Sequence, residues 1–94
     1  MPAEVKENPA LHRFELPIKG EAVAAAYYTI VDGRVVLTHT EVPEAMSGQG
    51  VGSKLVAGVL DAIRAEGVTV VPECEFVATF IQRHPGYQSL VAEN

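Results

Sequence analysis

The sequence predicts a small fold of the α+β or α/β class, with a mixed central sheet and two main helices. Strand-forming residues in its first half flank the dipeptide Asp32-Gly33, which is typical of an antiparallel hairpin. After Pro43 the apolar spacing changes from about two to about 3.6 residues, which indicates a helix. A β-branched run at 68–72 follows and predicts a parallel strand reached by a right-handed crossover.

The first half is expected to form antiparallel strands. The run 11–18 alternates imperfectly and contains Pro17, which suits a short first strand. The runs GEAVAAAYYTIVDG (20–33) and RVVLTHTEV (34–42) are the two arms of the hairpin. Residues 1–10 are polar and contain two prolines, so we expect a frayed lead-in or an edge segment. The whole chain, 1–94, is expected to be one domain.

The second half is expected to contain the two helices. An apolar stripe runs through 50–66, and Gly67 stands where a left-handed C-terminal cap is expected. The strand 68–72 is uninterrupted by charge and is expected to be buried on both faces. A second amphipathic helix covers 74–84 and stops before Pro85. Its predicted buried face carries Phe76, Val77, Phe80 and Ile81.

Composition limits the classes of partner and the compartment. Seven basic residues stand against twelve acidic ones, so the net charge of −5 argues against nucleic acid and anionic membranes as partners. The single cysteine, Cys74, cannot form an internal disulfide, and no signal-type segment or apolar run of about 20 residues is present. We expect a cytoplasmic protein. The three histidines and Cys74 lack metal-ligand spacing, so no metal site is predicted.

The stretch EAMSGQGVGSKL (44–55) places Gly48, Gly50 and Gly52 in the predicted turn between strand and helix. Main-chain N–H groups from 48 to 52 can converge there at a helix N-terminus, which favours a phosphate or diphosphate. Neither the Walker spacing nor the dinucleotide fingerprint is present. The alternative is a tight loop that binds nothing.

Two blocks, HTEVPEAMSGQGVGSKLV and VVPECEFVATFIQRHPGY, resemble the small Yjdj-type branch of the GNAT acetyltransferases, over roughly residues 13–90. The resemblance implies a minimal GNAT fold with acetyl-coenzyme A or coenzyme A at the centre of the sheet. The family's diphosphate loop, Gln/Arg-x-x-Gly-x-Gly/Ala, maps onto Ser47, Gly50 and Gly52, and Ser47 lacks the usual long side chain. The strand at 41–43 resembles the one that pairs with the pantetheine arm.

The resemblance, together with the helix-terminus argument, gives a set of expected cofactor-binding residues. Arg83 and His84 in the last turn of the second helix are expected to reach the adenosine phosphates. The full set is Val42, Pro43, Gly48, Gln49, Gly50, Val51, Gly52, Ser53, Lys54, Arg83 and His84.

Acyl transfer to an amine requires a base and a proton donor for the leaving thiolate, and three residues are candidates. Glu41 is the candidate base, because burial beside the pantetheine slot would strengthen it; the alternative is a solvated carboxylate. His39 lies two residues away and can relay a proton, or it is structural. Cys74 opens the second helix and is expected to accept the acyl group or donate a proton; the alternative is a small buried side chain.

These expectations lead to two main hypotheses. The first is an N-acetyltransferase that moves an acetyl group from acetyl-coenzyme A to a primary amine of unknown identity. The second is an acyl-coenzyme A-binding module with little or no transfer, and a purely structural domain is a remote third.

Tyr27 and Tyr28 must point to opposite faces of their strand, one into the core and the other toward the acceptor groove. A monomer or weak homodimer is expected.

Overall fold

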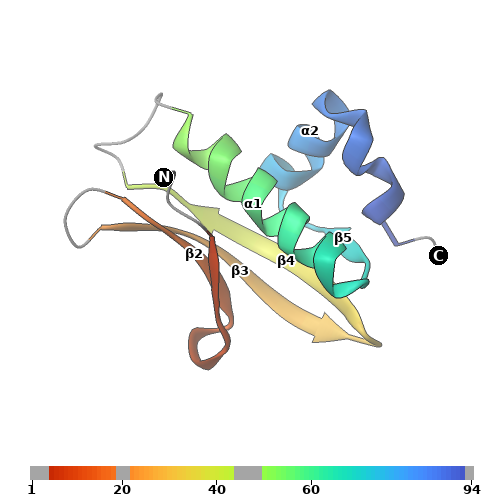
Figure 1. The fold of residues 1–94 in the computed structure, drawn as a ribbon, viewed down its shortest axis with the longest axis horizontal. Coiled ribbons are helices and arrows are strands. Elements are labelled where there is room, and N and C mark those ends of the chain that lie inside the picture. Colours follow the sequence, from red (N-terminus) through yellow and green to blue (C-terminus); the bar gives the residue numbers. More distant parts are fainter. Residues whose placement is uncertain (1–4, 19–21, 44–49, 93–94) are drawn as a thin grey trace.

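The computed structural model describes residues 5–18, 22–43 and 50–92. Within these segments one sheet has the strand order β1-β2-β3-β4-β5 (Figure 1). β4 and β5 are parallel, and the other neighbours are antiparallel, which confirms the predicted mixed sheet. The strands are β1 (Lys6–Asn8), β2 (Arg13–Pro17), β3 (Val23–Val31), β4 (Arg34–Glu41) and β5 (Val70–Pro72).

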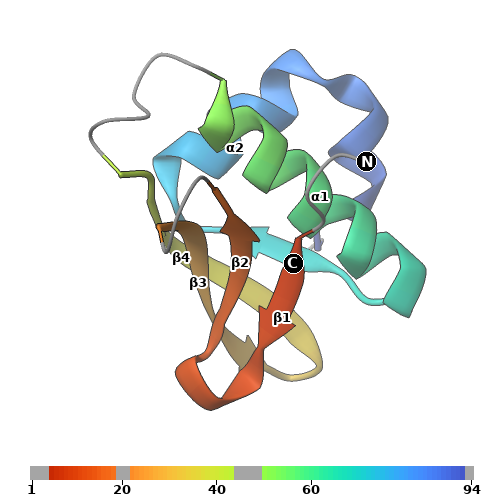
Figure 2. The same ribbon diagram turned by 60° about the vertical axis from the view of Figure 1, so that its left-hand side comes forward.

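Two helices lie on one side of this sheet, as Figures 1 and 2 both show. α1 (Val51–Glu66) connects β4 to β5 and crosses the sheet, and α2 (Glu75–Arg83) follows β5. Short 3-10 helices follow β1 (η1, Pro9–Leu11) and α2 (η3, Pro85–Leu90). The fold class expected from the sequence is confirmed.

The apolar stripe of α1 is its buried face, as its spacing predicts. The helix ends where Gly67 adopts a left-handed conformation, with a φ of 74°, and donates its N–H to the carbonyl of Arg64. The stripe packs against Phe14, Ala26 and Leu37 of the sheet in one core. The buried α1 residues are Val51, Leu55, Val56, Val59, Leu60 and Ile63.

At the two borders of the sheet, β1 and β5 differ in part from what the sequence predicts. Residues 6–8 form β1, so this part of 1–10 is an edge segment rather than a lead-in. β5 stands last in the strand order, and of its residues only Val70 is buried, which corrects the expected burial on both faces. The segment after η3 covers part of its outer edge, because the N–H of Ala92 donates to the carbonyl of Val70 at 2.8 Å. Non-local pairing decides this position, and periodicity cannot reveal it.

The second helix also differs in one residue from the expected burial pattern. Val77, Phe80 and Ile81 are buried, as predicted, but Phe76 in the first turn is 44% exposed. Its ring lies beside Gly52 of α1 instead of entering the core. Phe76 therefore belongs to the surface between the two helices.

Candidate active site

β4 continues beyond its pairing with β5, which leaves a gap in the sheet beside residues 38–41, and this gap organises the candidate site. β4 pairs with β5 only through Val35–Leu37, whereas β4 itself continues to Glu41. The chain leaves β5 at Pro72 and turns into α2. The part of β4 beyond Leu37 therefore has no partner in β5, at the carboxyl ends of two parallel strands, where α/β sheets bind ligands.

A β-bulge lies at the same point of β4. Tyr28 pairs with Leu37, but Tyr27 pairs with His39, which leaves Thr38 as the extra residue. A bulge increases the local twist of a strand and redirects the side chains that follow it. The bulge thus directly follows Leu37, the last residue of β4 that pairs with β5.

Cys74 stands at the inner end of this gap, on the helix side of the sheet. It is the N-cap residue of α2, and its N–H donates to the carbonyl of Leu37 at 2.9 Å. Its Sγ lies 3.7 Å from Oγ1 of Thr40, and either atom can be the donor. The side chain is partly buried. A thiol held at the start of a helix beside a hydroxyl is positioned to exchange a proton.

His39 and Glu41 lie together on the opposite face of β4. Nε2 of His39 is 3.4 Å from Oε1 of Glu41, so the two residues share a face as the sequence predicts. Their side chains are 62% and 58% exposed, which corrects the expectation that Glu41 is buried. The face is open because the helices all pack on the other side in the segments that the structure describes (Figure 2).

Alternation along β4 explains why the candidate residues occupy two faces. Thr40 pairs with Ala26, which belongs to the core beneath α1, so Thr40 and the Cys74 it contacts lie on the helix side. His39 and Glu41 flank Thr40 and project to the other side. Cys74 and the His39–Glu41 pair therefore flank the gap from opposite faces of the sheet.

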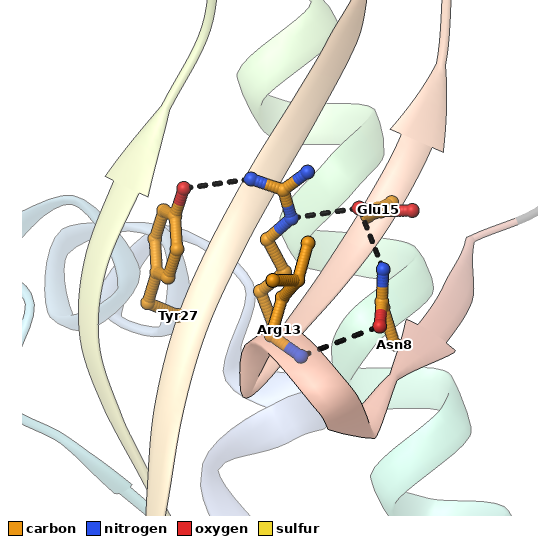
Figure 3. Close-up of polar contacts among 5 residues, drawn as sticks. Asn8, Arg13, Glu15 and Tyr27 are labelled. Atoms are coloured by element: carbon orange, nitrogen blue, oxygen red, sulfur yellow. Dashed lines mark hydrogen bonds and ion pairs between the residues drawn. The ribbon is translucent and has the colours of Figure 1, made fainter.

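A polar network on the open face fixes the surroundings of His39. The ring of Tyr27 stacks on His39, with centroids 6.0 Å apart. Figure 3 shows that Arg13 donates one hydrogen bond to the hydroxyl of Tyr27 (2.8 Å) and another to Glu15 (2.7 Å), which also accepts one from Asn8. The hydrogen bonds from Arg13 and then from Asn8 lower the pKa of Glu15, and those to Tyr27 and Glu15 raise the pKa of Arg13.

The N-terminus of α1 is the second part of the site. Gly50, its N-cap, has a φ of 76°, and no atom lies within 4 Å of the position its Cβ would take, so the backbone conformation favours glycine here. Val51, Gly52 and Ser53 form the first turn, whose N–H groups have no partner within a helix. The expected contributions of Ser47, Gly48 and Gln49 lie outside the described residues.

A groove of about 440 Å³ lies beside this helix start, between α1 and α2. Three of the expected cofactor residues line it, namely Ser53, Arg83 and His84. His84 is held there by a 2.8 Å hydrogen bond between its Nδ1 and the carbonyl of Phe80, and its ring stacks on that of Phe80. The other lining residues are Glu75, Phe76, Thr79 and Phe80, so the expected residues Val42, Pro43 and Cys74 lie outside the groove.

Lys54 is exposed on α1, one position beyond Ser53. Tyr87, which follows the groove residues, contacts α1: its hydroxyl donates to Asp61 at 3.0 Å, and the guanidinium of Arg64 lies 5.1 Å from its ring centroid. Tyr87 therefore joins η3 to α1.

Sequence reasoning missed two residues of this region. Thr40 contacts Cys74, and the strand period that placed His39 and Glu41 on one face also places Thr40 on the other. Phe76 was assigned to the core by its helical spacing. A Cβ at Gly52 would lie only 2.7 Å from Cζ of Phe76, so glycine at 52 admits this ring, and only the packing of α1 against α2 reveals it.

Within residues 5–18, 22–43 and 50–92, no three His, Cys, Asp or Glu side chains gather as metal ligands. Among the helices of these same segments, none has the length and apolar character required to cross a membrane.

Comparisons with known proteins agree with this architecture. Residues 13–90 match the profile of a family described as GCN5-related N-acetyl-transferase. Protein NATD1 of Bos taurus is 29% identical over 86 residues, which cover 89% of this chain and 76% of that protein; the Homo sapiens protein is 28% identical with the same coverage.

Among solved structures, the NMR solution structure of a GCN5-like candidate N-acetyltransferase from Staphylococcus aureus superposes with a TM-score of 0.71. It is 26% identical, and the match covers 98% of this chain and 90% of that one. Since the family profile spans most of the sequence, the chain belongs to the GCN5-related N-acetyltransferases and is an acyltransferase.

Proposed function

We propose that this protein transfers an acetyl group from acetyl-coenzyme A to a primary amine. The observation that carries the proposal is the gap between β4 and β5, which has Cys74 on one face and the His39–Glu41 pair on the other. A reaction that removes one proton from the nucleophile and gives one to the leaving group requires two such groups.

Two parts of the structure support binding of the coenzyme. The N-terminus of α1 presents main-chain N–H groups of 51–53, which suits a diphosphate. The adjoining groove is lined by Arg83, a residue type that suits further phosphate, and by Phe76, whose aromatic ring suits a base. Val42 and Pro43 continue from β4 beside the gap, where we expect the pantetheine arm.

The proposed chemistry assigns one proton transfer to each face of the sheet. Acetyl-coenzyme A supplies an acetyl thioester, whose C–S bond breaks as the C–N bond to the amine forms. Glu41 takes the proton of the amine, directly or through His39 at 3.4 Å. Cys74 gives its thiol proton to the departing sulfur and regains one from water; in the alternative scheme, Cys74 carries the acetyl group before the amine receives it.

The test is the amine-dependent release of free thiol from acetyl-coenzyme A, with a panel of small amines and peptides with free N-termini. Glu41→Gln and Cys74→Ala are each expected to lower kcat about 10²-fold. Their calorimetric affinity for acetyl-coenzyme A should stay within about twofold of the parent, because both act on the reacting atoms. Asp32→Asn, in the turn of the same hairpin, removes an equal charge and should leave turnover unchanged.

The possible outcomes separate the hypotheses. Binding of acetyl-coenzyme A without thiol release from any amine would replace this proposal with the acyl-coenzyme A-binding module, and no binding at all would indicate a structural domain. Because Cys74 is the single cysteine, the intact mass after incubation without amine decides between direct transfer and an acetylated thiol.

A further inference from the structure

A second hollow lies at the other end of α1, remote from the candidate active site. Its volume is about 400 Å³, within the range of small-molecule sites. It lies beside the last turns of α1, where Ala62, Ile63 and Glu66 line it. A helix of 16 residues is about 24 Å long, so a ligand here would not contact the groove at the helix start.

Most residues that line this hollow are apolar. Phe14, Tyr28 and Val35 of the sheet and Ile63 of α1 form its base and are buried. Ile30 of β3 lines its mouth and is 59% exposed. Covering apolar area stabilises a complex by about 25 cal/mol per Å², so this surface favours a ligand with an apolar body.

The charges at the rim all have one sign. Glu7 from β1 and Glu66 from α1 line the hollow, and no Lys or Arg is among its lining residues in the described segments. The carbonyl end of α1 adds partial negative charge, beside which a carboxylate such as Glu66 is unfavourable. Arg64, in the same turn, is engaged elsewhere, because its guanidinium donates to the carbonyl of Gly86 at 2.7 Å.

Tyr28 fixes one of the two carboxylates. Its hydroxyl donates a hydrogen bond to Oε2 of Glu7. Burial raises the pKa of Tyr28 to about 12, so the hydroxyl keeps its proton at neutral pH. A carboxylate that accepts one hydrogen bond retains further lone pairs, and Glu7 can accept another from a cation in the hollow.

We propose that this hollow binds an organic monocation, namely a protonated amine that carries a small apolar body. The apolar walls hold the body, and Glu7 and Glu66 pair with the ammonium at the rim. This goes beyond the acetyl transfer proposed above and does not depend on it, because the two sites lie at opposite ends of α1.

The test compares two probes of the same shape by two-dimensional NMR of the full chain, without acetyl-coenzyme A. Protonated 2-phenylethylamine is expected to shift the amides of Tyr28, Ile30 and Val68 in a saturable way, with a Kd of about 1–10 mM. The neutral 2-phenylethanol should bind at least about fivefold more weakly, because it lacks the charge.

Two variants locate the effect. Glu66 lies on the exposed rim, and Glu66→Gln should weaken binding of 2-phenylethylamine about three- to fivefold. Glu73→Gln removes the same charge from an exposed position outside the hollow and should not change it. Equal binding of the two probes, shifts confined to other residues, or equal effects of the two variants would overturn the proposal.

Discussion

The ionisation of Tyr28 affects the stability of the fold. Burial, and then its hydrogen bond to Glu7, raise its pKa to about 12. In the unfolded chain a tyrosine loses its proton near pH 10. Above about pH 10 the folded state therefore retains a proton that the unfolded state has lost, and unfolding becomes easier as pH rises. We expect the stabilising contribution of Tyr28 to be complete below about pH 10 and lost between about pH 10 and 12.

Ultraviolet titration of the folded protein measures the pKa of Tyr28 directly. Tyr28→Phe should remove the step with the highest pKa from the tyrosine titration. Tyr87→Phe is the control, because burial and then the hydrogen bond to Asp61 also raise the pKa of Tyr87. A highest step that survives in Tyr28→Phe would contradict the assignment.

Tyr27 acts on the proposed chemistry only through His39, on which its ring stacks. Tyr27→Leu removes the stacking and should lower kcat about tenfold, because a misplaced proton relay costs rate. The KM for acetyl-coenzyme A should stay unchanged, since Tyr27 lies on the face opposite α1 and α2. Tyr27→Phe keeps the ring and should resemble the parent in steady-state kinetics. An unchanged kcat in Tyr27→Leu would show that His39 needs no positioning.

Residue positions were predictable from the sequence where a local period decides them. The alternation of a strand predicts that Tyr27 and Tyr28 face opposite sides, and Tyr28 is indeed in the core. It also predicts that His39 and Glu41 share a face. The exposure of Glu41 was not predictable, because it depends on which face of the sheet the helices cover, and that is decided by packing between distant segments.

At the scale of elements, the contact between α1 and α2 shapes the groove proposed for the coenzyme. A Cβ at Gly52 would lie 2.7 Å from Cζ of Phe76, so Gly52→Ala should push this ring into the groove. We expect the affinity for acetyl-coenzyme A to fall about fivefold, measured by calorimetry. The free energy of unfolding should change by less than about 1 kcal/mol, because alanine's higher helix propensity offsets the strain.

A double-mutant cycle identifies the cause of that loss. In a Phe76→Ala background there is no ring to displace, so Gly52→Ala should leave the affinity unchanged. The same loss in both backgrounds would mean that the methyl group acts on the ligand itself.

The sequence predicted element bounds better than the burial of individual residues. The expected helix at 50–66 and the observed α1 at Val51–Glu66 differ by one residue, because apolar spacing and Gly67 are both local signals. The predicted burial of β5 on both faces and of Phe76 in the core was wrong in both cases for the same reason. Each depends on a contact between segments that the chain brings together only in the folded state.

At the scale of the whole molecule, α1 holds both terminal segments. On one side, Val5, which precedes β1, packs on Gly58 in the middle of the helix. On another, Arg64 and Asp61 bind Gly86 and Tyr87 of η3. The helix that joins β4 to β5 thus also joins the first strand to the last helical turn, which suits a small chain with a single core.

Gly58→Ala tests this central role of α1. In an isolated helix the substitution would stabilise the helix by up to about 1 kcal/mol. Here the new Cβ would lie 2.9 Å from Cβ of Val5 and closer still to one of its methyl groups, and β1 restrains the backbone beside Val5. We therefore expect Gly58→Ala to lower the free energy of unfolding in urea by about 1–2 kcal/mol. In a Val5→Gly background only helix propensity remains, and the same change should stabilise the protein. Stabilisation in both backgrounds would mean that the N-terminal segment does not lie across α1 in solution.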